Sequence, residues 1–209
     1  MGKQSRKKRE RRERPPGETK LQNYLDRVGL PDHPDPGRYQ RFAAANPEWF
    51  DQVVAADDVS LILSRSRDPD PEAVLAATRS RYGLLYRDLD TALAEYASRP
   101  VMIAAAWLRW WFEHHPPATR LLDVGCGPGV LTCAYALALP GAEVVGIDAV
   151  PEAVACAEEL ADRLGATNAS FMVGDFLDPA AGGGEFDQVV AVTALSDAGL
   201  YPQDPPAGS

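Results

Sequence analysis

The sequence predicts an α/β protein: a Rossmann-like, doubly wound parallel sheet preceded by a helical N-terminal region. Two observations carry this prediction. From about residue 118 onward, short apolar runs alternate with helical stretches, which is typical of parallel strands joined by right-handed crossovers. Residues 21–117 show helix signals throughout. We therefore divide the chain into residues 1–20, 21–117 and 118–209.

Residues 1–20 differ sharply in charge from the rest of the chain. They carry nine Lys or Arg against three Asp or Glu, whereas the remainder carries twelve arginines and 27 acidic residues. The basic segment has no periodic apolar residues, so we expect a disordered arm. An acidic body argues against a folded surface that grips nucleic acid, so contact with nucleic acid is expected only through this arm. A solvated tail is the alternative.

Cysteine use and hydrophobicity indicate the compartment. The three cysteines form no C-x-x-C pair, which predicts neither a disulfide framework nor a metal site and suits a reducing environment. The longest apolar run, Val101 to Leu108, is too short to span a membrane. The basic N-terminal segment is not followed by the apolar stretch of a secretory signal. We expect a soluble cytoplasmic protein with no membrane partner.

Local signals define helices and strands along the chain. Helix starts are predicted at Asn46-Pro47-Glu48 and Asp70-Pro71-Glu72, and a further helix over Pro100–His114 that ends at Pro116-Pro117. Four apolar runs predict strands over residues 120–124, 143–147, 170–173 and 186–192. A helix opened by Pro151 is predicted between the second and third runs, with Gly165 at its C-cap.

Carboxylates follow three of these predicted strands. Asp123 and Asp148 close the first two runs, and Asp175 follows the third. In a parallel sheet, ligands bind outside the carboxyl ends of the strands. Asp148 also lies nineteen residues after Gly129, near the usual interval for an acid that binds a ribose diol. The sequence therefore predicts a nucleoside-type site at this edge.

Three short motifs carry a family resemblance. Leu121-Leu-Asp123-Val-Gly125-Cys-Gly127-Pro-Gly129 resembles the first motif of class I S-adenosylmethionine-dependent methyltransferases. Val145-Gly-Ile-Asp148 and Gly174-Asp175-Phe176 resemble their second-strand and third-strand motifs. The match covers about residues 118–195.

The resemblance implies S-adenosyl-L-methionine as cofactor and a role for each matched residue. Asp123 with the loop glycines Gly125, Gly127 and Gly129 would hold the methionine part. Asp148 would bind the ribose hydroxyls, Asp175 would accept from the adenine amino group, and Phe176 or Ala149 would flank the ring. The residues themselves also favour a cation over a dinucleotide. Asp123 precedes the loop and Pro128 removes one backbone donor from it, whereas a pyrophosphate prefers donors without nearby acids.

The sequence departs from the family after the fourth strand. The segment Thr193-Ala-Leu-Ser196 lacks the Asn-Pro-Pro-aromatic motif of enzymes that methylate base or glutamine amino groups. The family sheet has seven strands ordered 3-2-1-4-5-7-6, and residues 196–209 cannot supply the last three. We therefore expect a sheet ordered 3-2-1-4, with the fourth strand at an edge through which the chain could self-associate.

These observations leave three functional readings open. The leading one is a methyltransferase acting on an unidentified acceptor, with the helical region over the cofactor cleft. Its catalytic residue is unknown, and Asp197 as a base is only a hypothesis. The second is a truncated, inactive relative that acts as a binding or partner protein, and the third is a nicotinamide-dependent oxidoreductase. We expect His114, His115, Cys126 and Asp187 to have structural rather than catalytic roles.

Overall fold

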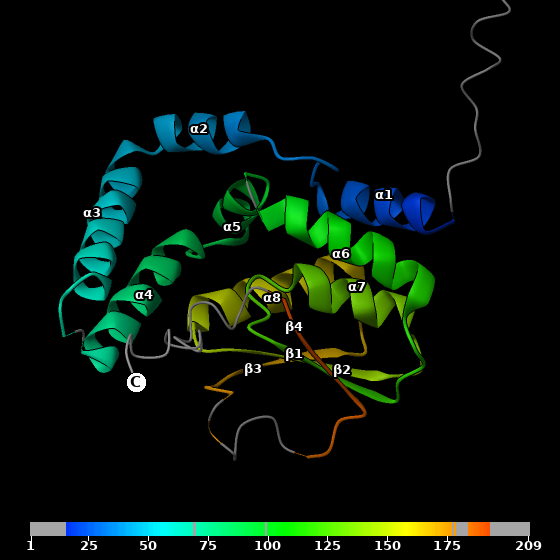
Figure 1. The fold of residues 1–209 in the computed structure, drawn as a ribbon. Coiled ribbons are helices and arrows are strands. Elements are labelled where there is room, and N and C mark those ends of the chain that lie inside the picture. Colours follow the sequence, from blue (N-terminus) through cyan, green and yellow to red (C-terminus); the bar gives the residue numbers. More distant parts are fainter. Residues whose placement is uncertain (1–15, 69, 99, 177, 179–183, 193–209) are drawn as a thin grey trace, which may run out of the picture.

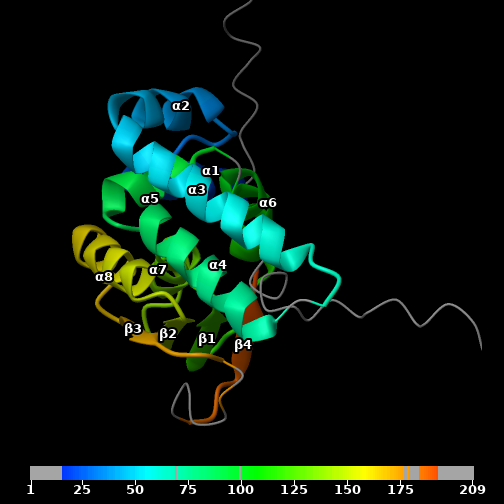
Figure 2. The ribbon, with the colours of Figure 1, turned by 90° about the vertical axis from the view of Figure 1, so that its left-hand side faces the viewer.

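The computed structural model describes residues 16–68, 70–98, 100–176, 178 and 184–192 (Figures 1 and 2). In these residues the helices before the sheet are α1 (Pro16–Val28), α2 (Pro36–Ala45), α3 (Pro47–Ser64), α4 (Pro71–Leu85), α5 (Leu89–Tyr96) and α6 (Pro100–His114). The sheet region then contains β1 (Arg120–Val124), α7 (Val130–Ala138), β2 (Glu143–Asp148), α8 (Pro151–Leu164), β3 (Ala169–Val173) and β4 (Gln188–Ala191).

The sheet is parallel and its strand order is β3-β2-β1-β4. Leu122 of β1 pairs with Val145 of β2 on one side and with Val189 of β4 on the other. The predicted order is therefore confirmed. Because β1 lies in the interior of the sheet, it has neighbours on both sides, and its residues Leu121, Asp123 and Val124 are buried.

The described helices of the sheet region lie on one face of the sheet. Figures 1 and 2 show α7 and α8 together with α6 on the same side of the strands. Since both crossovers, β1 to β2 and β2 to β3, turn in the same right-handed sense, α7 and α8 must cover the same face. Among the described residues no helix lies on the opposite face.

The main core joins the first helix to the sheet region. Leu21, Leu25 and Val28 of α1 are buried in one cluster with Trp111 of α6. Tyr24 reaches further and donates a hydrogen bond to the carbonyl of Val130, at the start of α7. Helix α1 is thus held to the sheet layer by both apolar packing and a buried hydrogen bond. None of the described helices is long and apolar enough to cross a membrane.

The helix α1 corrects one expectation. Residues 16–20 were predicted to belong to the disordered arm, but they form the first turns of α1. The buried residues that follow them pin the helix, and Glu18 lies in its first turn, where a negative charge interacts favourably with the helix dipole. The remaining arm, residues 1–15, lies outside the described residues.

A smaller core holds α2, α3 and α4 together. Its buried members are Ala43, Trp49, Val53 and Leu85. Helices α3 and α4 form an antiparallel pair that lies beyond the carboxyl ends of the strands (Figure 1). The predicted start of α4 is confirmed, since the Asp70 carboxylate accepts from the N–H of Glu72 at 3.0 Å.

The start of α3 is also where the sequence predicted it, but its cap differs. Asn46 occupies the N-cap position without a capping hydrogen bond from its side chain. Instead, its Nδ2 donates to the carbonyl of Phe42 at 2.9 Å. Pro47 at the first helical position removes one of the N–H groups that a cap would satisfy.

Candidate functional site

The candidate site forms where β1, β2 and β3 end side by side. Val124 pairs with Ile147, and Asp148 pairs with Val173, so the residues that follow these strands emerge at the same edge of the sheet. This edge gathers the residues to which the sequence assigned a cofactor: Asp123, Gly125, Gly127, Gly129, Asp148, Ala149, Asp175 and Phe176.

The loop after β1 needs glycine at its three glycine positions. Gly125, Gly127 and Gly129 have φ angles of +68°, +52° and +77°. Residues with a Cβ rarely adopt this left-handed region. The N–H groups of Gly125 and Cys126 donate to the carbonyl of Ile147 at 2.8 and 3.1 Å, which ties the loop to the end of β2.

At two of these glycines, the lack of a side chain determines how closely another group can approach the loop. A Cβ on Gly129 would lie 2.8 Å from the Cβ and 2.9 Å from the Cα of Ala157, so the loop can approach α8 this closely only without a side chain. A Cβ on Gly127 would meet only the hydroxyl of Tyr86, at 3.7 Å. The backbone at Gly127 therefore borders open space, as a loop that cradles a ligand requires.

Asp148 fixes the loop against the end of β2. Its Oδ2 accepts from the N–H of Gly127 at 2.8 Å, and its Oδ1 accepts from the N–H of Val150 at 2.9 Å. Burial raises the pKa of this carboxyl, and the N–H groups of Val150 and Gly127 partly oppose the rise. Each carboxylate oxygen has a second lone pair, so Asp148 can still accept from two ligand hydroxyls.

Asp123 lies deeper than the other acids. Its side chain is 2% exposed, and its Oδ2 accepts from the Thr132 hydroxyl at 2.6 Å. Burial raises the pKa of Asp123 to about 7, and the Thr132 hydrogen bond partly opposes this. Thr132 belongs to α7, so in this structure the carboxylate connects β1 to the helix that follows the glycine loop.

Asp175 lies at the end of β3 and is paired with the helical region. Its Oδ2 is 3.5 Å from Nη2 of Arg79 on α4, and both side chains are 41% exposed. Ala149 and Phe176 are the residues expected to flank a base. They follow Asp148 and Asp175 directly in the sequence, and both are half-buried.

Two residues of α4 and its C-cap residue contact the sheet region, and we call these three, Arg79, Gly83 and Tyr86, the α4 rim face. Arg79 pairs with Asp175. A Cβ on Gly83 would lie 3.3 Å from the carboxylate of Glu152, in the first turn of α8. Tyr86 places its hydroxyl beside Gly127. Helix α4 and its C-cap thus lie beside the glycine loop and the end of β3. That the helical region covers a cofactor cleft there stays a prediction.

The sequence did not identify the rim face. Neither Arg79 nor Gly83 belongs to a motif, and Tyr86 also packs against both hydrophobic cores, as a helical aromatic commonly does. The spacing of the three residues, four and then three positions apart, marks one side of a helix. That spacing alone does not say which surface the side faces, because the other elements decide it.

The residues expected to be structural are so placed. Asp187 accepts from the N–H and hydroxyl of Thr119, at 2.8 and 2.7 Å, and so anchors the start of β1. Burial raises the pKa of the Cys126 thiol, which disfavours a nucleophilic thiolate. His114 and His115 stack on Trp110 and Trp111 at the amino end of the sheet.

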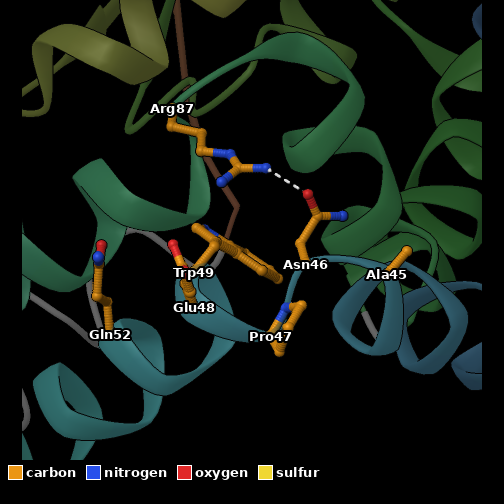
Figure 3. Close-up of a pocket in the computed structure, with 7 residues that line it drawn as sticks. All are labelled: Ala45, Asn46, Pro47, Glu48, Trp49, Gln52 and Arg87. Carbon is orange, nitrogen blue, oxygen red and sulfur yellow. Dashed lines mark hydrogen bonds between the residues drawn. The ribbon is translucent and has the colours of Figure 1, made fainter.

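A surface cavity of about 390 Å³ lies elsewhere, at the corner between α2 and α3 (Figure 3). Arg87 extends across it, with its guanidinium 5.2 Å from the Trp49 ring and its Nη2 donating to Oδ1 of Asn46 at 3.2 Å. Its Nε also lies 3.1 Å from the Asp88 carboxylate. These contacts tie α3 to the start of α5, which is a structural role for the arginine.

Comparison with known proteins gives a consistent family. A family model described as a methyltransferase domain matches residues 115–204. The chain is 44% identical over 146 residues to release factor glutamine methyltransferase of Vibrio cholerae, covering 68% of the chain and 50% of that protein. It is 47% identical over 91 residues to nocamycin O-methyltransferase of Saccharothrix syringae, and this match covers 43% of the chain and 31% of that protein.

A third relative is ribosomal RNA large subunit methyltransferase G of Streptomyces avermitilis, 42% identical over 157 residues, with 68% of the chain and 40% of that protein covered. The chain spans about half the length, or less, of the curated relatives it matches. The family match begins just before β1 and includes all three site motifs. The motifs, the sheet order and these similarities show that the chain belongs to the class I S-adenosylmethionine-dependent methyltransferases.

Proposed function

We propose that the chain binds S-adenosylmethionine at the edge where β1, β2 and β3 end, and that it catalyses methyl transfer to an acceptor. One observation carries the proposal: the glycine loop is bonded to the Asp148 carboxylate through the N–H of Gly127, with open space above that glycine. The site fits this cofactor because its acids, Asp123, Asp148 and Asp175, suit a ligand that carries sulfonium and ammonium charges.

Each part of the cofactor has residues that would hold it. The loop of Gly125, Gly127 and Gly129 would hold the methionine part through its backbone. Asp148 would accept from the two ribose hydroxyls with charge-assisted strength. Asp175 would accept from the adenine amino group, and Ala149 and Phe176 would flank the ring.

The bound cofactor supplies a methyl group on a positively charged sulfur, which a nucleophile can displace. The residues of the chain would orient that group and keep water from it. Helix α4, which lies across the strand ends, would supply the cover. In-line alignment of nucleophile, carbon and sulfur is the main requirement of such a transfer, and a rigid loop favours it.

Calorimetry with S-adenosylhomocysteine tests the binding site. Asp148→Ala should weaken binding by about 2–4 kcal/mol, because it removes charge-assisted hydrogen bonds to the ribose. Asp162→Ala, which removes an exposed acid from α8, is the matched control and should bind as the wild type does. Thermal melting of both variants separates lost binding from lost folding. Unchanged affinity in Asp148→Ala would contradict the assignment.

The acceptor is a separate question. The relatives are named for different acceptors, a release factor glutamine and an oxygen of nocamycin among them, so similarity does not single one out. A second reading, a cofactor-binding protein without catalysis, is motivated by the half-length match, because every described site residue belongs to cofactor binding. It predicts the same calorimetry and no formation of S-adenosylhomocysteine with protein, RNA or small-molecule acceptors.

A further inference from the structure

Two residues of the α4 rim face lie at different places along the strand ends. Tyr86 lies over the glycine loop, whereas Arg79 lies seven residues earlier on α4, at the end of β3. One turn of helix advances 5.4 Å, so these two side chains are roughly two turns apart along the cleft. Arg79 therefore belongs to the end of the cleft that the proposed function assigns to the adenine base.

Arg79 forms an ion pair with the acid at this end of the cleft. Its Nη2 is 3.5 Å from the Asp175 carboxylate. Burial raises the pKa of Asp148, and the charge of Arg79 is among the influences that oppose this rise. The pair with Asp175 is 41% exposed on both sides, and exposed ion pairs contribute little to folding stability. Stability alone therefore does not account for an arginine at this place.

We propose that Arg79 positions the adenine base, which binds at the end of β3 with one face against the guanidinium of Arg79. The inference rests on the proposed function. The guanidinium is planar, always charged, and stacks well on aromatic faces. A carboxylate has acceptor positions for several donors, so Asp175 can hold Arg79 and the exocyclic amine of adenine together. Through this ion pair Arg79 holds the carboxylate directed toward the base.

This arrangement selects for an amino group on the purine. A base with a carbonyl at the same position would place an oxygen against the Asp175 carboxylate, where two acceptors repel each other. Without Arg79 the carboxylate is free to rotate away, so the selection should weaken together with the affinity.

The test compares two ligands, S-adenosylhomocysteine and S-inosylhomocysteine, by calorimetry on the full 209-residue chain. The wild type should prefer the adenosyl compound. Arg79→Ala should weaken that ligand about tenfold while changing the inosyl ligand less, so the preference narrows. Arg79→Lys, which keeps the charge and loses the plane, should fall between. Arg67→Ala, an exposed arginine between α3 and α4, is the control and should leave both affinities unchanged.

The outcomes separate this inference from the function on which it rests. If the wild type does not bind S-adenosylhomocysteine, both fail. If it binds and Asp148→Ala loses binding, two results for Arg79→Ala refute the inference. One is unchanged affinity for both ligands. The other is an equal loss for both ligands, which would mean that Arg79 does not hold Asp175 toward the amino group. If Arg79→Ala does not fold, Arg79→Gln decides. It removes the charge that pairs with Asp175, so it must still narrow the preference.

Discussion

At the residue scale, Asp123 is unusual because its carboxyl group is buried next to the glycine loop. Its carboxylate accepts a hydrogen bond from the Thr132 hydroxyl, and burial raises its pKa from the ordinary value of 3.8 to about 7. A buried carboxyl with one hydroxyl donor is poorly solvated when ionised, so the proton is retained to a higher pH. This makes folding stability depend on pH.

The sign of that dependence follows from proton binding. Between about pH 4 and pH 7 the folded state holds a proton on Asp123 that the unfolded state has lost, so raising the pH favours unfolding. The contribution is complete below this window and lost above it. Asp123→Asn should remove it, because an amide does not titrate and its oxygen can still accept from Thr132.

Urea unfolding of the two proteins from pH 5.5 to 8 measures this effect. The wild type should lose stability relative to Asp123→Asn as the pH rises to 7, by at most about 1.4 kcal/mol per pH unit, and the difference should then level off. Other acids with a raised pKa, such as the half-buried Glu95, are common to both proteins and cancel in the comparison. Parallel stability curves would show that Asp123 does not titrate in this range.

At the scale of elements, the close approach of the glycine loop to α8 fixes the shape of the site. Gly129 combines a φ of +77° with backbone atoms of Ala157 where its Cβ would lie. Gly165, the C-cap of α8, has a similar φ of +69° but no atom within 4 Å of an added Cβ. Gly141 has neither constraint. Comparing substitutions at the three positions therefore distinguishes the cost of the left-handed backbone from the cost of a steric clash.

Alanine at each position should give a graded series in chemical denaturation. Gly141→Ala should be neutral or stabilising by up to about 1 kcal/mol, because it restricts the unfolded chain. Gly165→Ala should cost about 1–2 kcal/mol from the left-handed backbone. Gly129→Ala should cost about 3 kcal/mol or more, since it adds a clash with α8 to the same strain. Equal losses at Gly129 and Gly165 would mean that α8 moves away without cost.

At the scale of the whole molecule, the features that could be predicted from sequence are those with a local cause. Asp70 caps α4, and Gly165 ends α8 in the left-handed conformation. Both can be predicted from sequence, because the Asp70 side chain bonds to a neighbouring N–H group and glycine lacks the Cβ that disfavours this conformation. The strand-end acids were readable because a parallel sheet brings its carboxyl ends to one edge.

Features decided by contacts distant in sequence were not predicted. Helix α1 includes residues 16–20 because Leu21, Leu25 and Val28 find partners on α6 and in the sheet region, more than 70 residues along the chain. The position of Arg79 over β3 likewise depends on how α4 packs on α8. In both cases the local sequence fits more than one packing arrangement of the helix. Burial against residues distant in the sequence decides which arrangement forms.

The edge of the sheet has a consequence for the molecule as a whole. Among the described residues β4 pairs with β1 on one side and with no strand on the other. We predict that its outer backbone groups pair with another chain. Val189 lies on this strand and is 62% exposed. Because apolar edge strands favour association, the prediction from the sequence that copies of the chain associate through β4 stays a prediction.

Sedimentation velocity over a range of concentrations tests this association. The wild type should show a concentration-dependent increase in size, and Val189→Lys should reduce it, because a charged side chain on an edge strand opposes strand pairing between molecules. Val189 is mostly exposed, so the substitution should cost little folding stability. Ile62→Lys adds the same charge at a 70% exposed position on α3, away from the sheet, and should leave the association unchanged. An equal reduction by both variants would show that added charge, and not the β4 edge, controls the association.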